Sequence, residues 1–208
     1  MKKFLCLLIV LTILLSFSGC TKKAVAAMEE QIAALGTITL DSGDAIAAAE
    51  EAMAALNGKD RLAVTNKQIL TNARAQYQNL LAEKQADDLE VIIHDLRPIT
   101  FKSEPDLLNA DKLYNEADVD VKTRVENFYD LVTAFQFYQN LHVSRIERYI
   151  RAIGQVTADS GPAIEEARKF YDEATEDVQI LVYNYRTLME AEKAFEELQH
   201  AEEPAEEK

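Results

Sequence analysis

This sequence contains little glycine, proline, cysteine or basic charge, and each shortage excludes a class of protein. Its 208 residues include six Gly and four Pro, too few turn-forming residues for an all-β sandwich or barrel built from many short strands. Lys and Arg number 22 against 36 Asp and Glu, a net charge of −14. Nucleic-acid-binding surfaces carry the opposite sign, so we expect no nucleic-acid partner. Hydrophobic residues make up 48% of the chain, which is enough to form a core and unlike a disordered polymer.

Motifs that carry enzymatic or metal chemistry are also missing. The sequence has no HExxH or CxxC motif, no glycine-rich phosphate loop and no GxSxG element. Its histidines are His94, His142 and His200, which are far apart in the chain and have no ligand spacing between them. We therefore expect no catalytic residues, no metal site, no cofactor and no enzymatic activity.

Residues 1–19 have the pattern of a bacterial lipoprotein signal peptide. Lys2 and Lys3 precede an apolar run over 4–15, which is too short to span a bilayer comfortably. The run ends in Phe17-Ser18-Gly19-Cys20, which resembles a lipobox, the motif after which a lipidated cysteine becomes the mature N-terminus. The resemblance implies that Cys20 is the lipid attachment residue. The alternative is an ordinary secretory signal followed by a coincidental cysteine.

The cysteine count supports lipidation. The chain has two cysteines, and Cys6 lies inside the apolar run, so it would leave with the signal. The exported body then contains no disulfide, and Cys20 has no thiol partner. Acylation by two or more chains gives stable anchoring. We therefore expect a protein held by its N-terminal lipid at the extracytoplasmic face of the cell membrane, with 20–27 as a lipidated tether.

The remainder of the chain consists of three copies of one unit. Aligning 28–82, 89–143 and 146–200 requires no gap inside any copy, and ten positions are identical in all three. In the first copy these positions are Glu29, Ile32, Thr39, Ser42, Ala49, Val64, Asn66, Leu70, Ala73 and Leu80. We define repeat 1 as 28–85, repeat 2 as 86–143 and repeat 3 as 144–200, followed by an acidic tail over 201–208.

Each repeat shows the periodicity of three amphipathic helices. In repeat 1 the third stripe is Leu70, Ala73, Tyr77 and Leu80, the spacing of three and four that places apolar residues on one helix face. Neither Gly nor Pro interrupts the chain between the third stripe of one repeat and the first stripe of the next. The sequence therefore predicts an all-α fold of three tandem three-helix bundles, joined by shared long helices into an elongated rod.

Repeated polar residues mark the predicted helix ends. A serine precedes the second helix of each repeat and an asparagine precedes the third, and we expect both side chains to cap the free N–H groups that follow. The serines are Ser42, Ser103 and Ser160, and the asparagines are Asn66, Asn127 and Asn184. Pro105 and Pro162 fall in the first turn of the second helix, where proline is tolerated.

The unit resembles the three-helix repeats, including FIVAR-like modules, that occur in tandem in large surface proteins of Gram-positive bacteria. The resemblance rests on the Ile-Gly-x-Val-Thr-x-x-Ser stretch over 153–160 and on Val-x-Asn-x-x-x-Leu-x-x-Ala-Glu over 182–192. It implies display at the cell surface, spacing, and binding to protein or glycan, and it carries over no catalytic residue.

Aromatic residues are concentrated in repeats 2 and 3, often in adjacent pairs that cannot both face a thin core. Tyr129, Tyr183 and Tyr185 are the residues we expect to be exposed and to contact a ligand. The sequence thus predicts a lipid-anchored module that binds a macromolecule or acts as a spacer at the cell envelope. Its partner is an envelope protein or glycan of unknown identity, and the alternative function is that of a glycan- or peptidoglycan-binding surface module.

Overall fold

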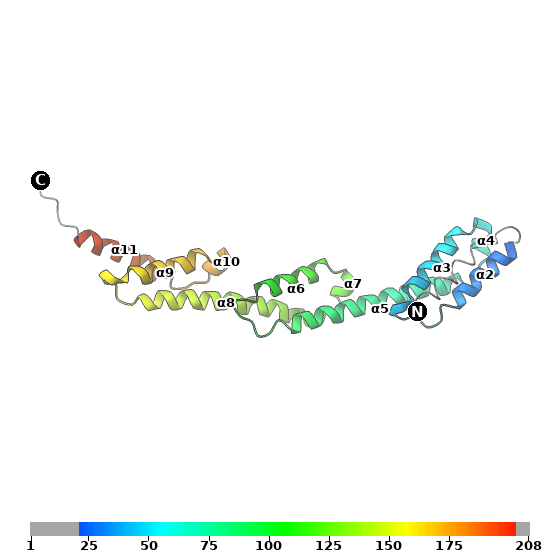
Figure 1. Cartoon of the computed structure of the whole chain (residues 1–208), viewed down its shortest axis with the longest axis horizontal. Helices are drawn as coiled ribbons and strands as arrows, with labels where there is room; N and C mark the ends of the chain where they lie inside the picture. Colours follow the sequence, from blue (N-terminus) through cyan, green and yellow to red (C-terminus); the bar gives the residue numbers. More distant parts are fainter. Residues whose placement is uncertain (1–20, 203–208) are drawn as a thin grey trace, which may run out of the picture. The chain divides into compact units, whose positions relative to one another are not determined.

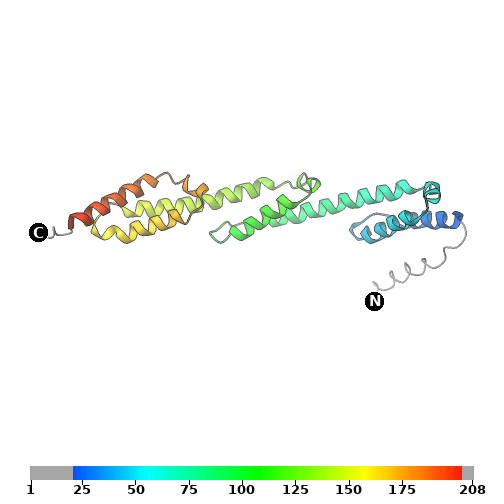
Figure 2. The same cartoon turned by 90° about the horizontal axis from the view of Figure 1, so that it is seen from above.

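The computed structural model describes residues 21–202, and the regular structure in this part of the chain consists of helices joined by loops, with no strand (Figures 1 and 2). It contains ten α-helices, α2 to α11, and two 3-10 turns, η2 and η3. The expected signal peptide, Cys20 and residues 203–208 of the acidic tail lie outside the described residues. The chain divides after Gln85 into two compact units, and each is described by itself.

Unit 1 packs helices α2, α3, α4 and the first part of α5 around one apolar core. These elements are α2 (Thr21–Ala33), η2 (Leu40–Ser42), α3 (Gly43–Ala55), α4 (Gly58–Ala63) and α5 (Lys67–His94). The buried core consists of Met28, Ile32, Ile46, Ala49, Leu70 and Ala73, which recur at helical spacing, together with Ile38 from the loop after α2 and Val64 directly after α4. Because α2 begins at Thr21, residues 21–27 of the expected tether are helical, and Val25 among them packs against this core.

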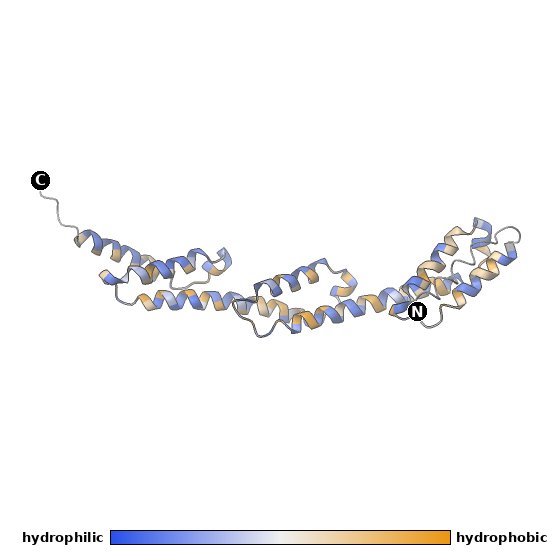
Figure 3. Ribbon diagram, viewed as in Figure 1, coloured by the Kyte–Doolittle hydropathy of each residue, from blue (hydrophilic) through white to orange (hydrophobic). Residues whose placement is uncertain are grey.

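Unit 2 contains the end of α5 and all later elements. These are α6 (Glu104–Glu116), α7 (Val119–Lys122), α8 (Phe128–Ile153), η3 (Ala158–Ser160), α9 (Gly161–Asp172), α10 (Glu176–Gln179) and α11 (Tyr185–Glu202). Helix α8 packs against α6 and also against α9, α10 and α11. Apolar and polar residues alternate along each helix (Figure 3). The apolar faces meet inside, with Ile146, Ile150, Ile164 and Leu188 among the most buried side chains.

Two helices run without interruption through the positions where one repeat meets the next. Helix α5 has 28 residues and α8 has 26. Both lack Gly and Pro inside, so no residue removes a backbone hydrogen bond or adds flexibility there. Helix α8 therefore supplies both the expected third helix of repeat 2 and the expected first helix of repeat 3.

The helix ends follow from local sequence. Gly36 and Gly154, which follow α2 and α8, have φ angles of 58° and 61°, a region that side chains with a Cβ rarely occupy. Pro105 and Pro162 lie in the first turn of α6 and α9, as predicted. The short helical turn expected before the third helix of repeat 1 is α4.

Candidate functional site

The serines expected to cap the second helices occupy the N-cap positions, but their side chains do not bond to those helices. Ser42, Ser103 and Ser160 occupy the N-cap positions of α3, α6 and α9, and none makes a side-chain cap bond to its helix. Each hydroxyl instead accepts a 2.9 Å hydrogen bond from the backbone N–H three residues earlier. The prediction of side-chain caps was wrong because each serine hydroxyl bonds to the backbone N–H of the threonine in the preceding loop instead.

The asparagines before the third helices were also predicted to cap those helices, but their amides bond to the first helix of the repeat instead. Asn127 occupies the N-cap position of α8 without a side-chain cap bond. The amide Nδ2 of each asparagine instead donates to the backbone oxygen of a glutamate 37 residues earlier, at 2.9, 2.9 and 3.1 Å in repeats 1, 2 and 3. The acceptors are Glu29, Glu90 and Glu147. These bonds join the first and third helices of each repeat.

The glutamate side chain completes this contact in the opposite direction. Its Oε1 accepts from the backbone N–H just before the asparagine, at 2.8 Å from Thr65, 2.7 Å from Glu126 and 3.4 Å from Tyr183. In repeat 1 the Thr65 bonds hold the pKa of Glu29 below its usual value. The sequence signal was available, since both the glutamate and the asparagine are identical in all three copies. Residue type alone did not predict that the glutamate and the asparagine contact each other, because they lie far apart in the chain.

A second contact between helices was missed altogether. In unit 1, Arg74 on α5 forms a bidentate pair with Glu50 on α3, with a 2.8 Å bond from Nε to Oε1. In unit 2, Arg168 on α9 forms the same pair with Glu192 on α11, with a 2.6 Å bond from Nε to Oε1. The hydrogen bonds lower the pKa of Glu50 and raise that of Arg168.

The candidate tyrosines differ in exposure. Tyr129 is 80% exposed and Tyr183 is 73% exposed. Tyr185 is half-buried, its ring stacks on Tyr171 at 4.2 Å, and its hydroxyl accepts a 3.3 Å hydrogen bond from Arg168. The exposure expected for Tyr185 is therefore wrong, because this ring packs against the apolar core of repeat 3.

The two exposed tyrosines do not form one site. Tyr129 lies in the first turn of α8, whereas Tyr183 is held beside residues 147–151 of the same helix. Its hydroxyl accepts a 2.8 Å hydrogen bond from Arg151, which lies 3.7 Å from Glu147. At 1.5 Å per residue, the 18 residues from 129 to 147 correspond to roughly 27 Å along the helix. A single small ligand cannot contact both rings.

Polar and aromatic groups also meet where α8 passes from repeat 2 to repeat 3. The His142 ring lies 4.7 Å from that of Tyr138 and 5.2 Å from that of Phe101. The Arg145 guanidinium lies 3.7 Å from the centre of the Phe170 ring and 5.3 Å from that of Phe101. Burial and the positive charge of Arg145 lower the pKa of His142. His142 Nε2 is buried and has no hydrogen-bond partner among the described residues, so it keeps the cost of losing its bonds to water.

The described part of the chain supports neither a metal cluster nor a membrane-spanning helix. Residues 21–202 contain no group of three or more His, Cys, Asp or Glu side chains placed to hold a metal ion. None of the helices described there combines the length and apolar content needed to cross a bilayer.

Comparison of this chain with known protein families, curated proteins and solved structures finds no match. The resemblance to FIVAR-like repeats therefore stays a prediction from the sequence.

Proposed function

We propose that this protein is a lipid-anchored, extracytoplasmic helical-repeat protein that serves as a binding or spacer module at the cell envelope. The observation that carries the proposal is the lipobox-like run from Phe17 to Cys20, placed directly after a cationic start and a short apolar segment. Removal of Lys2 and Lys3 with the signal leaves 20 basic against 36 acidic residues. A body of this charge is repelled by anionic lipids, which favours a tethered arrangement over one that lies on the membrane.

The experiment is metabolic labelling with a palmitate analogue in a bacterium that processes lipoproteins. The Cys20→Ser variant should lose the label and leave the membrane fraction. Cys6→Ser is the matched control, because it removes the only other cysteine and leaves the processing site unchanged. Equal labelling of Cys20→Ser and the unaltered chain would rule out lipid attachment at Cys20 and would favour an ordinary secretory signal.

The proposal includes an architecture of three tandem three-helix bundles that share long helices and form an elongated rod. It is supported by the gap-free repeat alignment, by the uninterrupted α8 and by the recurrence of the glutamate–asparagine contact in all three repeats. Small-angle scattering on residues 21–208 is the test. A radius of gyration near the compact value of roughly 17 Å for this chain length would contradict the rod.

Binding of a glycan such as peptidoglycan is the second candidate function. It is favoured by the exposed rings of Tyr129 and Tyr183, since sugars pack on aromatic faces and hydrogen-bond to nearby polar groups. Retention of the protein on insoluble peptidoglycan, reduced by Tyr183→Thr and by Tyr129→Gln, would support this function. The substituted residues are those of the aligned positions in repeat 1, Thr65 and Gln68, so both variants should fold.

A further inference from the structure

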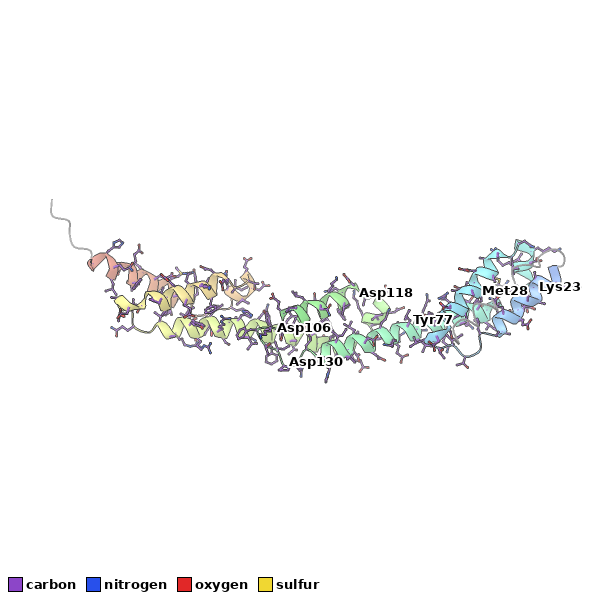
Figure 4. The ribbon with its side chains drawn as sticks, viewed as in Figure 1. Lys23, Met28, Tyr77, Asp106, Asp118 and Asp130 are labelled. Atoms are coloured by element: carbon purple, nitrogen blue, oxygen red, sulfur yellow. The ribbon has the colours of Figure 1, made fainter. Side chains whose placement is uncertain are left out.

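The end of unit 1 at which α2 begins carries a cluster of basic side chains. We call it the basic tip; it comprises the start of α2 (residues 21–25) and α4 with its N-cap (residues 57–63). Helix α4 lies against α2 at this end (Figures 1 and 2), and Thr65, which follows α4, bonds to Glu29 of α2. The basic residues, all of them exposed, are Lys22, Lys23 (labelled in Figure 4), Lys59 and Arg61.

The basic tip contains one acidic residue, and this residue does not face solvent. Asp60 is 5% exposed, and its Oδ2 accepts a 2.8 Å hydrogen bond from the Asn57 amide. The aligned residues of repeats 2 and 3 are Val121 and Val178, which are also buried. Asp60 therefore occupies a core position, and the charge that the tip presents to solvent is positive.

The next carboxylates along the neighbouring helices lie further from the tip. Glu29 on α2 accepts hydrogen bonds from the backbone N–H and the hydroxyl of Thr65, at 2.8 and 2.6 Å. Glu30 is exposed but lies eight residues after Lys22, roughly 12 Å along α2. Glu51 is exposed and lies four residues before the end of α3, roughly 6 Å along that helix. These groups do not cancel the positive charge at the tip itself.

The aligned ends of the other two repeats lack this excess of positive charge. In repeat 2, residues 82–86 and 118–124 contain three acidic and three basic residues. In repeat 3, residues 139–143 and 175–181 contain two acidic residues and no basic residue. All three ends expose a large apolar side chain, which is Leu62 at 79%, Val119 at 73% and Ile180 at 75%. Apolar exposure is therefore common to the repeats, whereas excess positive charge belongs to repeat 1.

The basic tip is also the part of the body closest to the expected lipid. Cys20 directly precedes α2 in the chain. Because consecutive Cα atoms are about 3.8 Å apart, Lys22 lies within roughly 8 Å of the residue expected to be lipidated. A lipid on Cys20 would therefore hold the tip at the level of the bilayer headgroups.

We propose that the basic tip binds the anionic lipid headgroups around the anchor, with Leu62 inserted at the boundary between headgroups and acyl chains. Each Lys or Arg near an anionic surface strengthens the attraction, and an exposed leucine is stabilised where it leaves water. The rest of the exported body, without Asp60 and the four basic residues of the tip, has 16 basic and 35 acidic residues. The same lipids repel it, so contact is limited to the tip. The inference rests on the lipid anchor proposed above.

The test uses the mature lipoprotein, extracted from membranes and reconstituted into vesicles of phosphatidylcholine alone or of phosphatidylcholine with phosphatidylglycerol. A fluorophore is attached at Ala63→Cys, an exposed position at the end of α4, or at Leu181→Cys, the aligned position in repeat 3. Labelling is specific because Cys6 leaves with the signal and the Cys20 thiol is acylated. Quenching by acrylamide, which is uncharged, measures how well the aqueous phase reaches each fluorophore.

The charge of the tip is altered with residues that the fold accepts in repeat 3. Lys59→Asp with Arg61→Gln introduces the residue types of positions 177 and 179. Gln179 donates to backbone oxygens at the end of α9, as Arg61 does at the end of α3, so the variant keeps this contact. The control is Arg186→Gln with Lys193→Asp, which makes the same substitutions at exposed residues of α11.

The apolar contact is tested at one aligned position in two repeats. Leu62→Thr introduces the residue type that repeat 2 has at position 123. Its control is Ile180→Thr, at the aligned and equally exposed residue of repeat 3. Circular dichroism should show unchanged helicity in every variant.

We expect quenching at position 63 to be roughly threefold weaker on anionic than on neutral vesicles, and quenching at position 181 to be equal on both. Lys59→Asp with Arg61→Gln should abolish the difference at position 63, as should high salt, which screens the attraction. Leu62→Thr should reduce the difference by about half, and both controls should leave it unchanged. Equal quenching at position 63 on the two kinds of vesicle would overturn the proposal. Equal losses in the charge variant and its control would overturn it as well.

Failure of the tip contact and failure of the anchor give different results. A chain that is retained on both kinds of vesicle, with equal quenching at position 63, would remove the tip contact and leave the lipoprotein proposal intact. A chain without lipid at Cys20 that stays in solution with both kinds of vesicle would remove the anchor and the tip contact together.

Discussion

Repeats 1 and 3 hold the same salt bridge with its polarity reversed, and this reversal gives a quantitative test of the repeat alignment. Glu50 on α3 faces Arg74 on α5, whereas Arg168 on α9 faces Glu192 on α11. Position 50 aligns with 168 and position 74 with 192, 118 residues apart in both cases. Exchanging the charges of repeat 3 should therefore reproduce the arrangement of repeat 1.

The magnitude follows from exposure and geometry. The side chains of Arg168 and Glu192 are 27% and 32% exposed, so their bidentate pair is only partly screened by solvent. Either Arg168→Glu or Glu192→Arg alone replaces the pair with two like charges, and we expect the free energy of unfolding to fall by about 1–3 kcal/mol. The double exchange should recover most of this loss.

Recovery should be substantial but incomplete, because the surroundings match on one side of the pair only. In repeat 1, the Arg74 guanidinium lies 5.9 Å from the ring centre of Tyr77, the tyrosine labelled in Figure 4. The aligned residue of repeat 3 is Phe195. An arginine at 192 would therefore lie three residues before the Phe195 ring, as Arg74 lies three residues before Tyr77.

The exchange loses the contacts of Arg168 with the Tyr185 hydroxyl and ring, at 3.3 and 5.3 Å. It also turns the 3.5 Å pair of Arg168 with Asp172 into two like charges, and repeat 1 has Ala54 at the aligned position. Together these changes should leave a deficit of about 1 kcal/mol.

The assay is urea unfolding followed by circular dichroism, with hydrogen exchange to localise the change to α9 and α11. Lys169→Glu is the control for charge, since its 3.9 Å pair with Glu173 is 67% and 60% exposed and should contribute less than about 0.5 kcal/mol. If the double variant has a free energy of unfolding no higher than that of the less stable single variant, the charges at positions 168 and 192 cannot be exchanged and the reasoning is refuted.

Two further predictions concern contacts inside unit 2. Asn184→Ala removes the 3.1 Å bond from Nδ2 to the Glu147 backbone oxygen and should lower the free energy of unfolding by about 1–2 kcal/mol in urea titrations; an unchanged midpoint would show that the bond does not hold the helices together. The pKa of His142 is lowered in the folded chain, so the unfolded chain binds a proton first as pH falls. The free energy of unfolding should therefore decrease once the pH falls below 6.5, the ordinary histidine pKa. Melting temperatures at pH 7.5 and 5.5 should therefore differ less in His142→Leu, which has the residue of repeat 1 at this position, than in the unaltered protein. An equal difference in both proteins would contradict this role.

The helical content and the buried positions were predictable from the sequence because they depend on local spacing. Three- and four-residue intervals place Ile32, Ile46 and Leu70 on helix faces that are buried in the structure. The absence of Gly and Pro between stripes predicted that helices would continue where repeats meet, and α8 does so. Proline placement in α6 and α9 followed from the same local rules.

The candidate site was predictable only in part. Tyr129 and Tyr183 are exposed as expected, but Tyr185 is half-buried. Exposure of an aromatic residue depends on which neighbour covers it, and Tyr171, which covers Tyr185, lies on a different helix. No spacing rule within α11 contains that information.

The sequence by itself determined that the chain is helical, where most helices lie and which faces they bury, because these properties depend on residues within one or two turns of each other. It did not give the start of α2, which begins inside the expected tether. Only the tertiary structure decided which polar groups meet. Asn184 was expected to cap its own helix and instead bonds to Glu147, 37 residues earlier, and Arg168 pairs with Glu192, 24 residues later. Both outcomes depend on how helices pack side by side, since a buried hydrogen-bonding group takes the partner that packing brings within reach rather than the nearest one along the chain.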